Sequence, residues 1–276
     1  MKNLQSRIEQ AFNLVKSRFP FKGYMDHALP ACITICEAIM RLVPPESGVN
    51  VLDFACGPCD KTAVLASLGY HCSGYDDLED DWHKIPGKRL QIDKFIIEMG
   101  IDFKSKAEGP FSWLPGSFDV VMMNDILEHL HDSPRQLLNG LLPLLKDDGL
   151  LLITVPSAVN IRKRLDVICG RTNLARFESY FWYPDSWRGH IREYTKGDLI
   201  QLAKFMDLEI VELRSCDHML QIVPPMFRLP YRIVTGVFTG WKDSWLLVAR
   251  RNKNWQPKEL RRSEIDEILK RFGGSY

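Results

Sequence analysis

The sequence predicts an α/β protein with a parallel sheet and crossover helices, because strand-like and helix-like segments alternate along it. From residue 48 onward, the strand-like segments are VNVLDFA, YHCSGYD, FDVVMMN and GLLLITVP. Helix-like segments separate them near residues 61–68 and after Pro134, where Ser133 suits the capping position. A chain of 276 residues is long enough to form a single domain around one large core.

The composition is that of a globular protein, with 45% hydrophobic and 26% charged residues, and it excludes a disordered or fibrous chain. A net charge of +1 provides no bulk field to concentrate nucleic acid, so no nucleic-acid partner is expected. The chain begins without a signal-peptide core and contains no span-length apolar stretch, so a cytoplasmic location is expected. The seven cysteines suggest reduced, buried thiols rather than a disulfide framework.

Residues 1–47 are predicted to form a helical extension. Apolar side chains recur at helical spacing between residues 6 and 18, and Ser6 with Glu9 matches a capping box. A second apolar helix over residues 31–42 has to end before Pro44, since proline restricts the residue before it and lacks an amide donor. A core of alternating strands and helices is predicted to follow over residues 48–157.

The second half of the chain begins with an irregular segment and continues with a helix and two strands. Residues 158–194 have no clear period and are interpreted as a substrate-side insertion. Residues 195–250 hold a helix capped by Thr195 and Asp198, followed by two final strands. Between these strands, the proline-broken apolar stretch 220–240 is expected to cover the sheet edge as a lid of broken helices. The polar tail 251–276 holds one short helix over residues 263–271.

The segment VLDFACGPCD has the features of a cofactor-binding turn. A strand ends in Asp53, a tight turn forms around Gly57, and a helix starts near Asp60, so backbone amides and the positive helix end meet there. Asp76 and Asp77 end the next strand, where a carboxylate accepts hydrogen bonds from ribose hydroxyls. This combination predicts a cofactor that contains a nucleoside, so residues 48–157 are the predicted cofactor-binding core.

The charge of the turn favours S-adenosylmethionine over a dinucleotide. The three positions of a G-x-G-x-x-G fingerprint hold Ala55, Gly57 and Asp60. A carboxylate at the third position would repel a diphosphate, which S-adenosylmethionine lacks. That cofactor offers a carboxylate to the helix start, an ammonium group to Asp53 and a ribose to Asp76.

VLDFACGPCD, GYDD, SFDVVMMNDILEHL and GLLLITVPS resemble successive motifs of the class I S-adenosylmethionine-dependent methyltransferases. The resemblance covers roughly residues 50–157 and, more loosely, 190–250. It implies a doubly wound, Rossmann-like fold with a mixed seven-stranded sheet. It also implies that Asp53 holds the cofactor's amino group, Asn124 lies near the sulfonium, and Glu108 is a candidate on the adenine side. The cofactor-binding residues implied are Asp53, Ala55, Cys56, Gly57, Asp76, Asp77 and Asn124.

The cysteines of the turn allow a competing interpretation. Members of the family generally read Asp-x-Gly-x-Gly-x-Gly in the first motif. The two outer glycine positions of this motif are Ala55 and Cys59 here. Cys56-Gly-Pro-Cys59 has the spelling of a thioredoxin-like dithiol, whose thiol pKa can be depressed at a helix start. Cys32 and Cys36 could complete a zinc set with this pair, but buried thiols explain them better, and no metal is predicted.

Polar residues that follow the strand-like segment FDVVMMN form the first candidate acceptor site, since ligands of such sheets bind at the carboxyl edge. The cluster consists of Asn124, Asp125, Glu128, His129 and His131. His129 is the preferred general base because imidazole titrates near neutrality. Alternatively, Glu128 and His129 only cap or pin the adjoining loops.

The segment RGHIREYT provides a second candidate cluster. His190, Arg192 and Tyr194 alternate, so on an extended segment they share one face; His190 is a second catalytic candidate, and the other two are substrate-binding candidates. A salt bridge and a packed ring are the structural alternative. The segment resembles a methyltransferase branch associated with sugar and surface-polysaccharide biosynthesis, and the aromatic run 177–187 would suit stacking on a sugar or quinone ring.

The leading function is methyl transfer from S-adenosylmethionine to a small-molecule or glycan acceptor, with oxygen, nitrogen and carbon left open as the methylated atom. The alternatives are a non-catalytic cofactor-binding scaffold and a thiol-disulfide redox protein. The stretch 220–240 also carries Arg228 and Arg232, so peripheral contact with a membrane or a lipid-linked acceptor is a further hypothesis.

Overall fold

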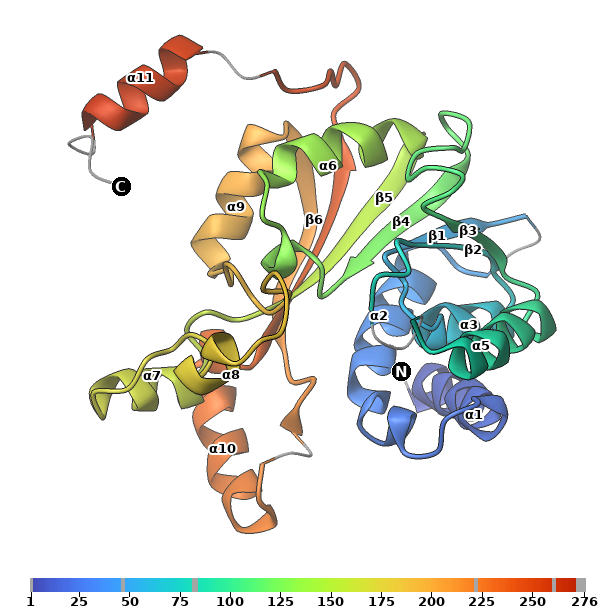
Figure 1. Cartoon of the computed structure of the whole chain (residues 1–276), viewed down its shortest axis with the longest axis horizontal. Helices are drawn as coiled ribbons and strands as arrows, with labels where there is room; N and C mark the ends of the chain where they lie inside the picture. The colour runs from blue at the N-terminus through green and yellow to red at the C-terminus, as the bar shows by residue number, and fades with distance from the viewer. Residues whose placement is uncertain (1, 46–47, 81–83, 221–222, 260–261, 272–276) are drawn as a thin grey trace.

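The chain folds around a seven-stranded mixed sheet, which confirms the predicted fold class (Figure 1). The computed structural model describes residues 2–45, 48–80, 84–220, 223–259 and 262–271. The strand order is β3-β2-β1-β4-β5-β7-β6, and only β7 runs antiparallel to its two neighbours. The strands are β1 Asn50–Phe54, β2 His71–Asp76, β3 Asp102–Ser105, β4 Phe118–Asn124, β5 Leu145–Pro156, β6 Leu208–Cys216 and β7 Ser244–Arg251.

Helices cover both faces of the sheet. Side chains alternate along a strand, so Val120 and Met122 of β4 join one core while Val121 and Met123 join the other. The first core is completed by the helices α1 Lys2–Arg18, α2 Leu29–Leu42, α3 Asp60–Ser67 and α5 Pro86–Glu98. The second is completed by the helices α6 Pro134–Leu141 and α9 Lys196–Phe205. The helical extension at the N-terminus is therefore packed into the core.

Three helices lie beyond one end of the sheet, and a fourth helix follows β7 in the chain. Figure 1 shows α7 Ile161–Ile168, α8 Phe177–Phe181 and α10 Pro225–Val237 near one another and below the carboxyl end of β5. They come from the predicted insertion and from the stretch 220–240. The tail carries α11 Arg262–Arg271, as predicted. Short 3-10 turns are η1 Tyr24–His27, η2 Leu127–His129, η3 Leu142–Leu144 and η5 Thr239–Trp241.

Local capping predictions are confirmed for two helices and wrong for one. Ser133 Oγ accepts a hydrogen bond from the Arg135 amide at α6, and Thr195 forms a capping box with Asp198 at α9. Ser6, in contrast, lies inside α1, which begins at Lys2. The apolar pattern continues through Leu4, which packs against the core, and this extends the helix beyond the predicted cap.

The stretch 220–240 differs from the prediction, although residues 221–222 lie outside the described part. Pro225–Val237 is one helix with Pro230 inside it, not a set of broken helices. It is also not buried over the core: Met226, Leu229 and Val237 are 76%, 69% and 71% exposed. Within α10, Thr235 is the buried residue. Among the described residues, no helix has the length and apolar character needed to cross a bilayer.

Candidate functional site

The turn after β1 is built from left-handed backbone at alternate positions. Ala55, Gly57 and Cys59 have φ values of 56°, 54° and 61°. The amides of Cys56 and Gly57 donate to the Tyr75 carbonyl and the Asp76 carboxylate, so β2 holds the turn in shape before it leads into the start of α3. Ala55 and Cys59 stand where the family generally has glycine, and each adopts the backbone that glycine would adopt without strain.

Asp53 lies at the carboxyl end of β1 and is buried. Its two oxygens accept hydrogen bonds from Thr62 Oγ1 at 2.6 Å and from Asn124 Nδ2 at 3.4 Å. Burial raises the pKa of the Asp53 carboxyl to about 7, and the hydrogen bond from Thr62 opposes this rise. The structure thus brings together two residues predicted for the amino-group and sulfonium ends of the cofactor.

Asp76 lies at the end of β2 and is joined directly to the turn. Its Oδ2 accepts the amide of Gly57 at 2.8 Å, and its Oδ1 accepts the amide of Leu78 at 2.9 Å. Asp77 is exposed, and its carboxylate lies 3.8 Å from Arg188. Glu108 accepts the amide of Ser105 at 2.9 Å and the hydroxyl at 2.8 Å, so it closes the loop after β3; these hydrogen bonds lower its pKa.

The two thiols of the turn pack against β2. Cys56 Sγ lies 3.3 Å from Cys59 Sγ, and both residues are buried. A Cβ added at Gly74 would lie 3.0 Å and 3.3 Å from these sulfurs, so glycine in β2 makes room for them. Burial raises the pKa of the Cys56 thiol, opposite to the depression that a reactive dithiol needs. Within the described residues, Cys32 and Cys36 form no metal-ligand group with this pair.

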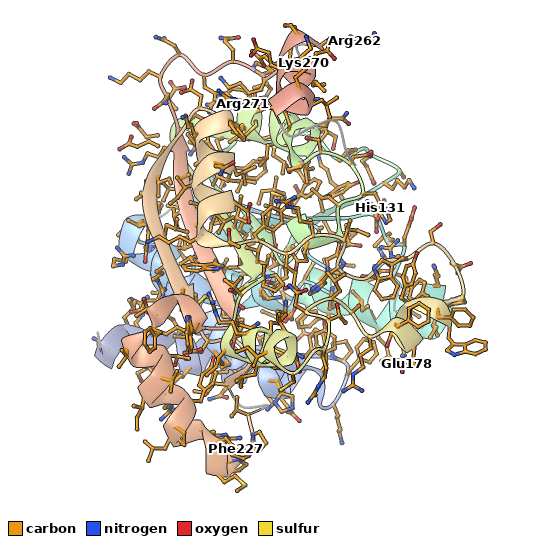
Figure 2. All side chains as sticks on the ribbon, turned by 90° about the vertical axis from the view of Figure 1, so that its left-hand side faces the viewer. His131, Glu178, Phe227, Arg262, Lys270 and Arg271 are labelled. Carbon is orange, nitrogen blue, oxygen red and sulfur yellow. The ribbon has the colours of Figure 1, made fainter. Side chains whose placement is uncertain are left out.

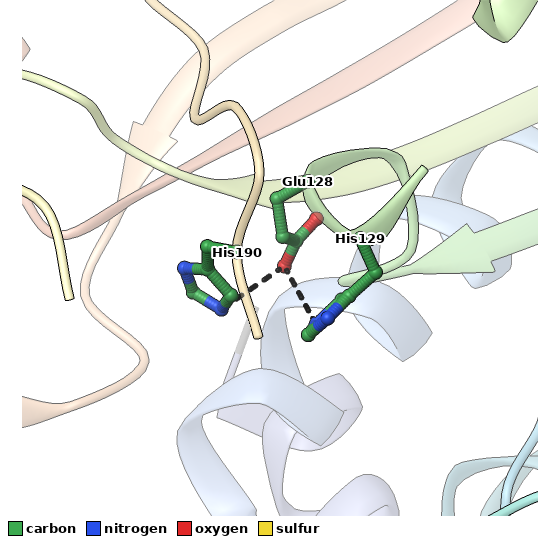
Figure 3. Close-up of side chains that lie close together, drawn as sticks. All are labelled: Glu128, His129 and His190. Carbon is green, nitrogen blue, oxygen red and sulfur yellow. Dashed lines mark ion pairs between the residues drawn. The ribbon is translucent and has the colours of Figure 1, made fainter. Parts of the chain in front are cut away.

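A second cluster forms where η2 follows β4. Glu128, from η2, is fully buried, and its Oε1 lies 3.9 Å from Nε2 of both His129 and His190 (Figure 3). Burial raises the pKa of the Glu128 carboxyl to about 8, and the nearby charge of Asp125 adds to the rise. Burial lowers the pKa of the His190 imidazole. Both predicted catalytic histidines therefore meet at one buried carboxylate.

The end of the insertion forms a strap, residues 187–192, across the loops after β2 and β4. The amide of Ile191 donates to the Glu128 carbonyl at 2.6 Å, and the Arg188 carbonyl lies 2.7 Å from His129 Nδ1. The Arg188 guanidinium lies 3.2 Å from the carboxylates of Glu79 and Asp80. The strap thus links the acidic loop beside the cofactor turn to the histidine cluster.

The predicted shared face of His190, Arg192 and Tyr194 is wrong, because the three side chains occupy different environments. Tyr194 is buried in the second core, with its hydroxyl 3.4 Å from the Leu127 carbonyl. Arg192 is exposed and lies 3.2 Å from Asp198. Their geometry matches the structural alternative of a packed ring and a salt bridge.

Lys163 and Glu193 were not predicted for the site. Lys163 of α7 is 5% exposed and its Nζ contacts Glu193, whose other oxygen lies 2.8 Å from His190 Nδ1. Burial lowers the pKa of the Lys163 ammonium to about 8. Nothing in the sequence indicates that Lys163 belongs to the site, because lysine side chains are usually exposed to solvent.

Known proteins resemble this chain in sequence. The sequence profile of the methyltransferase domain matches residues 25–213. The ubiquinone biosynthesis O-methyltransferase of Burkholderia vietnamiensis is 26% identical over 173 residues, which are 61% of this chain and 68% of that protein. The protein of the same description from Paraburkholderia xenovorans is 24% identical with the same coverage. The predicted association with sugar and surface-polysaccharide enzymes is not supported, because the relatives found are described as ubiquinone biosynthesis O-methyltransferases.

Solved structures agree on the fold. A protein of Pyrococcus horikoshii OT3 superposes with a TM-score of 0.52 and 17% identity, covering 84% of this chain and 97% of its own. The magnesium protoporphyrin IX methyltransferase of Synechocystis PCC 6803, solved with bound SAH, gives a TM-score of 0.50 and 16% identity, covering 88% and 94%. The profile match includes β1, the turn and the histidine cluster. The chain belongs to the methyltransferase-domain family and is an S-adenosylmethionine-dependent methyltransferase.

Proposed function

We propose that the enzyme transfers a methyl group to a hydroxyl oxygen of a small-molecule acceptor. The observation that carries this proposal is the convergence of Glu128, His129 and His190 where η2 follows β4, at the same sheet edge as the cofactor turn. A hydroxyl acceptor has to lose a proton during methyl transfer, and imidazole is suited to accept it. The 24% and 26% identical relatives described as O-methyltransferases support oxygen as the methylated atom.

The cofactor turn has the shape and charge that S-adenosylmethionine requires. The turn leads into the start of α3, where the positive end of the helix suits the cofactor's carboxylate, and no atom lies within 4 Å of a Cβ placed at Gly57. Asp53 would hold the ammonium group, Asn124 would lie beside it, and Asp76 would accept the ribose hydroxyls. The bound cofactor supplies a methyl group on a sulfonium, which is a good leaving group. The protein's contribution is therefore mainly to position the acceptor.

His129 is proposed as the general base, with His190 as the second candidate. The Arg188 carbonyl can only accept a hydrogen bond, so His129 Nδ1 carries the hydrogen and Nε2 keeps its lone pair. The same reasoning applies to His190, whose Nδ1 lies 2.8 Å from the Glu193 carboxylate. Either Nε2 can accept the hydroxyl proton as the new oxygen–carbon bond forms.

A methylation assay tests this proposal. The enzyme is incubated with S-adenosylmethionine and a panel of phenols, catechols, amines and reducing sugars, and S-adenosylhomocysteine release is measured. We expect turnover with a hydroxylated aromatic, and a loss of at least tenfold in His129→Gln. His71→Gln is the matched control, because this exposed imidazole lies at the amino end of β2, away from the carboxyl edge of the sheet. Turnover of amines alone would contradict the proposal, and turnover of sugars alone would favour the glycan acceptor.

The exposed apolar surface of α10 supports peripheral contact with a membrane that carries the acceptor. Phe227 and Ile233 are 55% and 60% exposed, and Arg232 is exposed on the same helix. Figure 2 shows Phe227 at the end of the molecule opposite the basic residues of α11. Apolar side chains edged by basic ones suit an acidic bilayer surface. A hydrophobic acceptor dissolved in that bilayer would then lie near α7 and α10.

The scaffold alternative predicts no transfer and is tested separately by calorimetric titration with S-adenosylmethionine. Binding in the micromolar range with turnover supports the enzyme. If the strained residues Ala55 and Cys59 prevented cofactor binding, the titration would give no heat and the scaffold would be favoured.

A further inference from the structure

Glu128, His129 and His190 have the arrangement of a three-ligand metal site. One carboxylate oxygen and two imidazole nitrogens, one from each residue, lie within 4.8 Å of one another. Glu128 Oε1 is 3.9 Å from each Nε2, too far for a hydrogen bond, and the two rings stand at 87° with centroids 4.9 Å apart (Figure 3). Three atoms with lone pairs therefore face a shared space.

The burial of Glu128 is a second and independent observation. Its side chain is 0% exposed, and neither carboxylate oxygen has a hydrogen-bond partner among the described residues. A buried carboxylate without a partner is costly, so it requires a proton or a cation. Both histidines face this carboxylate with Nε2, and each uses Nδ1 as a donor elsewhere, so Nε2 of a neutral imidazole has no hydrogen to donate to Glu128.

The outer nitrogens of both histidines are held as they are in metal sites. His129 Nδ1 lies 2.7 Å from the Arg188 carbonyl, and His190 Nδ1 lies 2.8 Å from the Glu193 carboxylate. Metal-bound imidazoles almost always donate their second N–H to a carbonyl or a carboxylate, which fixes the ring and leaves the other nitrogen free for the ion. Lys163 contacts Glu193 and so positions the partner of His190.

We propose that these three residues bind one divalent first-row transition-metal ion of the Zn²⁺ type. Two imidazoles and one carboxylate form a set that suits zinc better than magnesium, which prefers oxygen ligands. Tetrahedral bonds of about 2.0–2.1 Å place ligand atoms roughly 3.4 Å apart, so small side-chain rotations would close the set. Three protein ligands leave a position open, as in catalytic rather than structural zinc sites.

The role of the ion rests on the proposed methyl transfer to a hydroxyl. The binding of the ion to these three residues does not depend on that proposal. An ion at this position would take over the part assigned to imidazole, because coordination lowers the pKa of a hydroxyl as it does for water. The released proton passes to solvent. The oxygen–carbon bond then forms while the sulfur–carbon bond of the donor breaks, and the ion keeps its oxidation state. Both Nε2 atoms would serve as ligands and not as bases.

Metal binding is tested without any methyl transfer. The chelator-treated full chain is titrated with ZnCl2 by calorimetry and with CoCl2 by visible absorption. We expect one ion per chain, Co²⁺ bands of an N,O-coordinated site, and at least a tenfold loss of Zn²⁺ affinity in Glu128→Gln, His129→Gln and His190→Gln. His71→Gln, at an exposed histidine that begins β2, should bind as the parent does. Circular dichroism of each variant checks its fold. If Glu128→Gln misfolds, His190→Gln still tests the site, because the His190 side chain is 39% exposed.

Two results would overturn the proposal: no Zn²⁺ or Co²⁺ binding to the parent, or binding that the three substitutions leave unchanged. Neither result affects the proposed O-methyl transfer, which would then run with imidazole as the base. Conversely, a parent that binds one Zn²⁺ at these residues and methylates no hydroxyl retains the metal site and loses only the proposed function.

Discussion

The amide of Gly57 donates a 2.8 Å hydrogen bond to the carboxylate of Asp76, so the cofactor turn and the end of β2 hold each other in place. An acid predicted to bind ribose thus also fixes the loop that receives the rest of the cofactor. The two oxygens of Asp76 therefore hold the amides of both Gly57 and Leu78 at the end of β2.

Substituting Asp76→Ala is expected to weaken S-adenosylmethionine binding at least tenfold, because hydrogen bonds to a charged acceptor are worth about 1.5–3 kcal/mol. Calorimetric titration measures the dissociation constant, and thermal unfolding checks that the turn survives. Asp77→Ala is the matched control, since this exposed neighbour lies beside Arg188. An unchanged constant in Asp76→Ala would contradict the ribose assignment unless Asp77→Ala showed the loss.

Cofactor affinity should depend on pH through Asp53. Burial raises the pKa of this carboxyl to about 7, so at pH 6 it is mostly protonated and cannot pair with an ammonium group. Between pH 6 and 7.5, below the ordinary pKa of an α-amino group at about 7.7–8.0, affinity should rise severalfold. Asp53→Asn should bind weakly and with a flat profile over this range. A parent with a flat profile would remove Asp53 from the ammonium contact.

The sign is opposite for stability without ligand. A raised folded-state pKa means that the folded protein keeps a proton that the unfolded chain releases. The contribution of Asp53 to the free energy of unfolding is therefore fully present below about pH 4 and is lost as the pH rises to about 7. Comparing urea unfolding of the parent and Asp53→Asn at pH 5 and 7.5 measures this difference.

The pair Cys56 and Cys59 is expected to be structural. Cys56→Ser with Cys59→Ser should still bind the cofactor, and the parent should not reduce insulin disulfides, since burial raises the Cys56 thiol pKa. Cofactor calorimetry and an insulin turbidity assay measure the two properties. Robust insulin reduction by the parent, absent from the double variant, would establish the thiol-disulfide function instead.

Replacing Gly57→Ala separates backbone strain from cofactor contact. Gly57 has φ 54° and no atom within 4 Å of an added Cβ, so the stability loss should be that of a left-handed alanine, about 1 kcal/mol. The same Cβ enters the space expected for the cofactor, and affinity should fall well beyond the loss of stability. Gly87→Ala is the control, since its Cβ also meets open space but its φ is not left-handed. Equal cofactor affinity in parent and Gly57→Ala would show that the ligand does not approach this turn.

Membrane contact through α10 predicts co-sedimentation with acidic liposomes at moderate salt. Phe227→Asp with Ile233→Asp should abolish it, and Arg232→Glu should weaken it, because apolar and basic residues both contribute. Arg228→Glu is less suitable, since the Arg228 Nε already donates to the Val223 carbonyl at 2.9 Å. Ile97→Asp is the matched control: it is 77% exposed but lies on α5. Failure of the parent to sediment, or equal sedimentation of all variants, would exclude α10 as a membrane surface.

The strands of the cofactor half could be predicted because each is a buried apolar run bounded by turn residues. Strand β3 was missed, since Asp102–Ser105 is a short edge strand whose residues are only partly buried. Helix α10 was predicted as broken, but Pro230 lacks only one amide donor, and an exposed helix tolerates this where carbonyls reach water. Within the site, Asp53 and Asp76 lie at the carboxyl ends of strands and so have fixed places. Lys163 comes from an aperiodic segment, and only the folded chain brings it to Glu193, which follows His190 by three residues.

Strand β7 follows the other six strands of the sheet in the sequence, but it lies between β5 and β6. Leu247 pairs with Ile153 on one side and with Leu213 on the other. Until residues 244–251 leave the ribosome, β6 has no partner and β5 presents an open edge, which favours pairing with another chain. The cofactor-binding strands can assemble early through short crossovers, whereas the sheet closes late and over long sequence separations. A chain shortened before Ser244 would keep β1–β4 and be prone to aggregate.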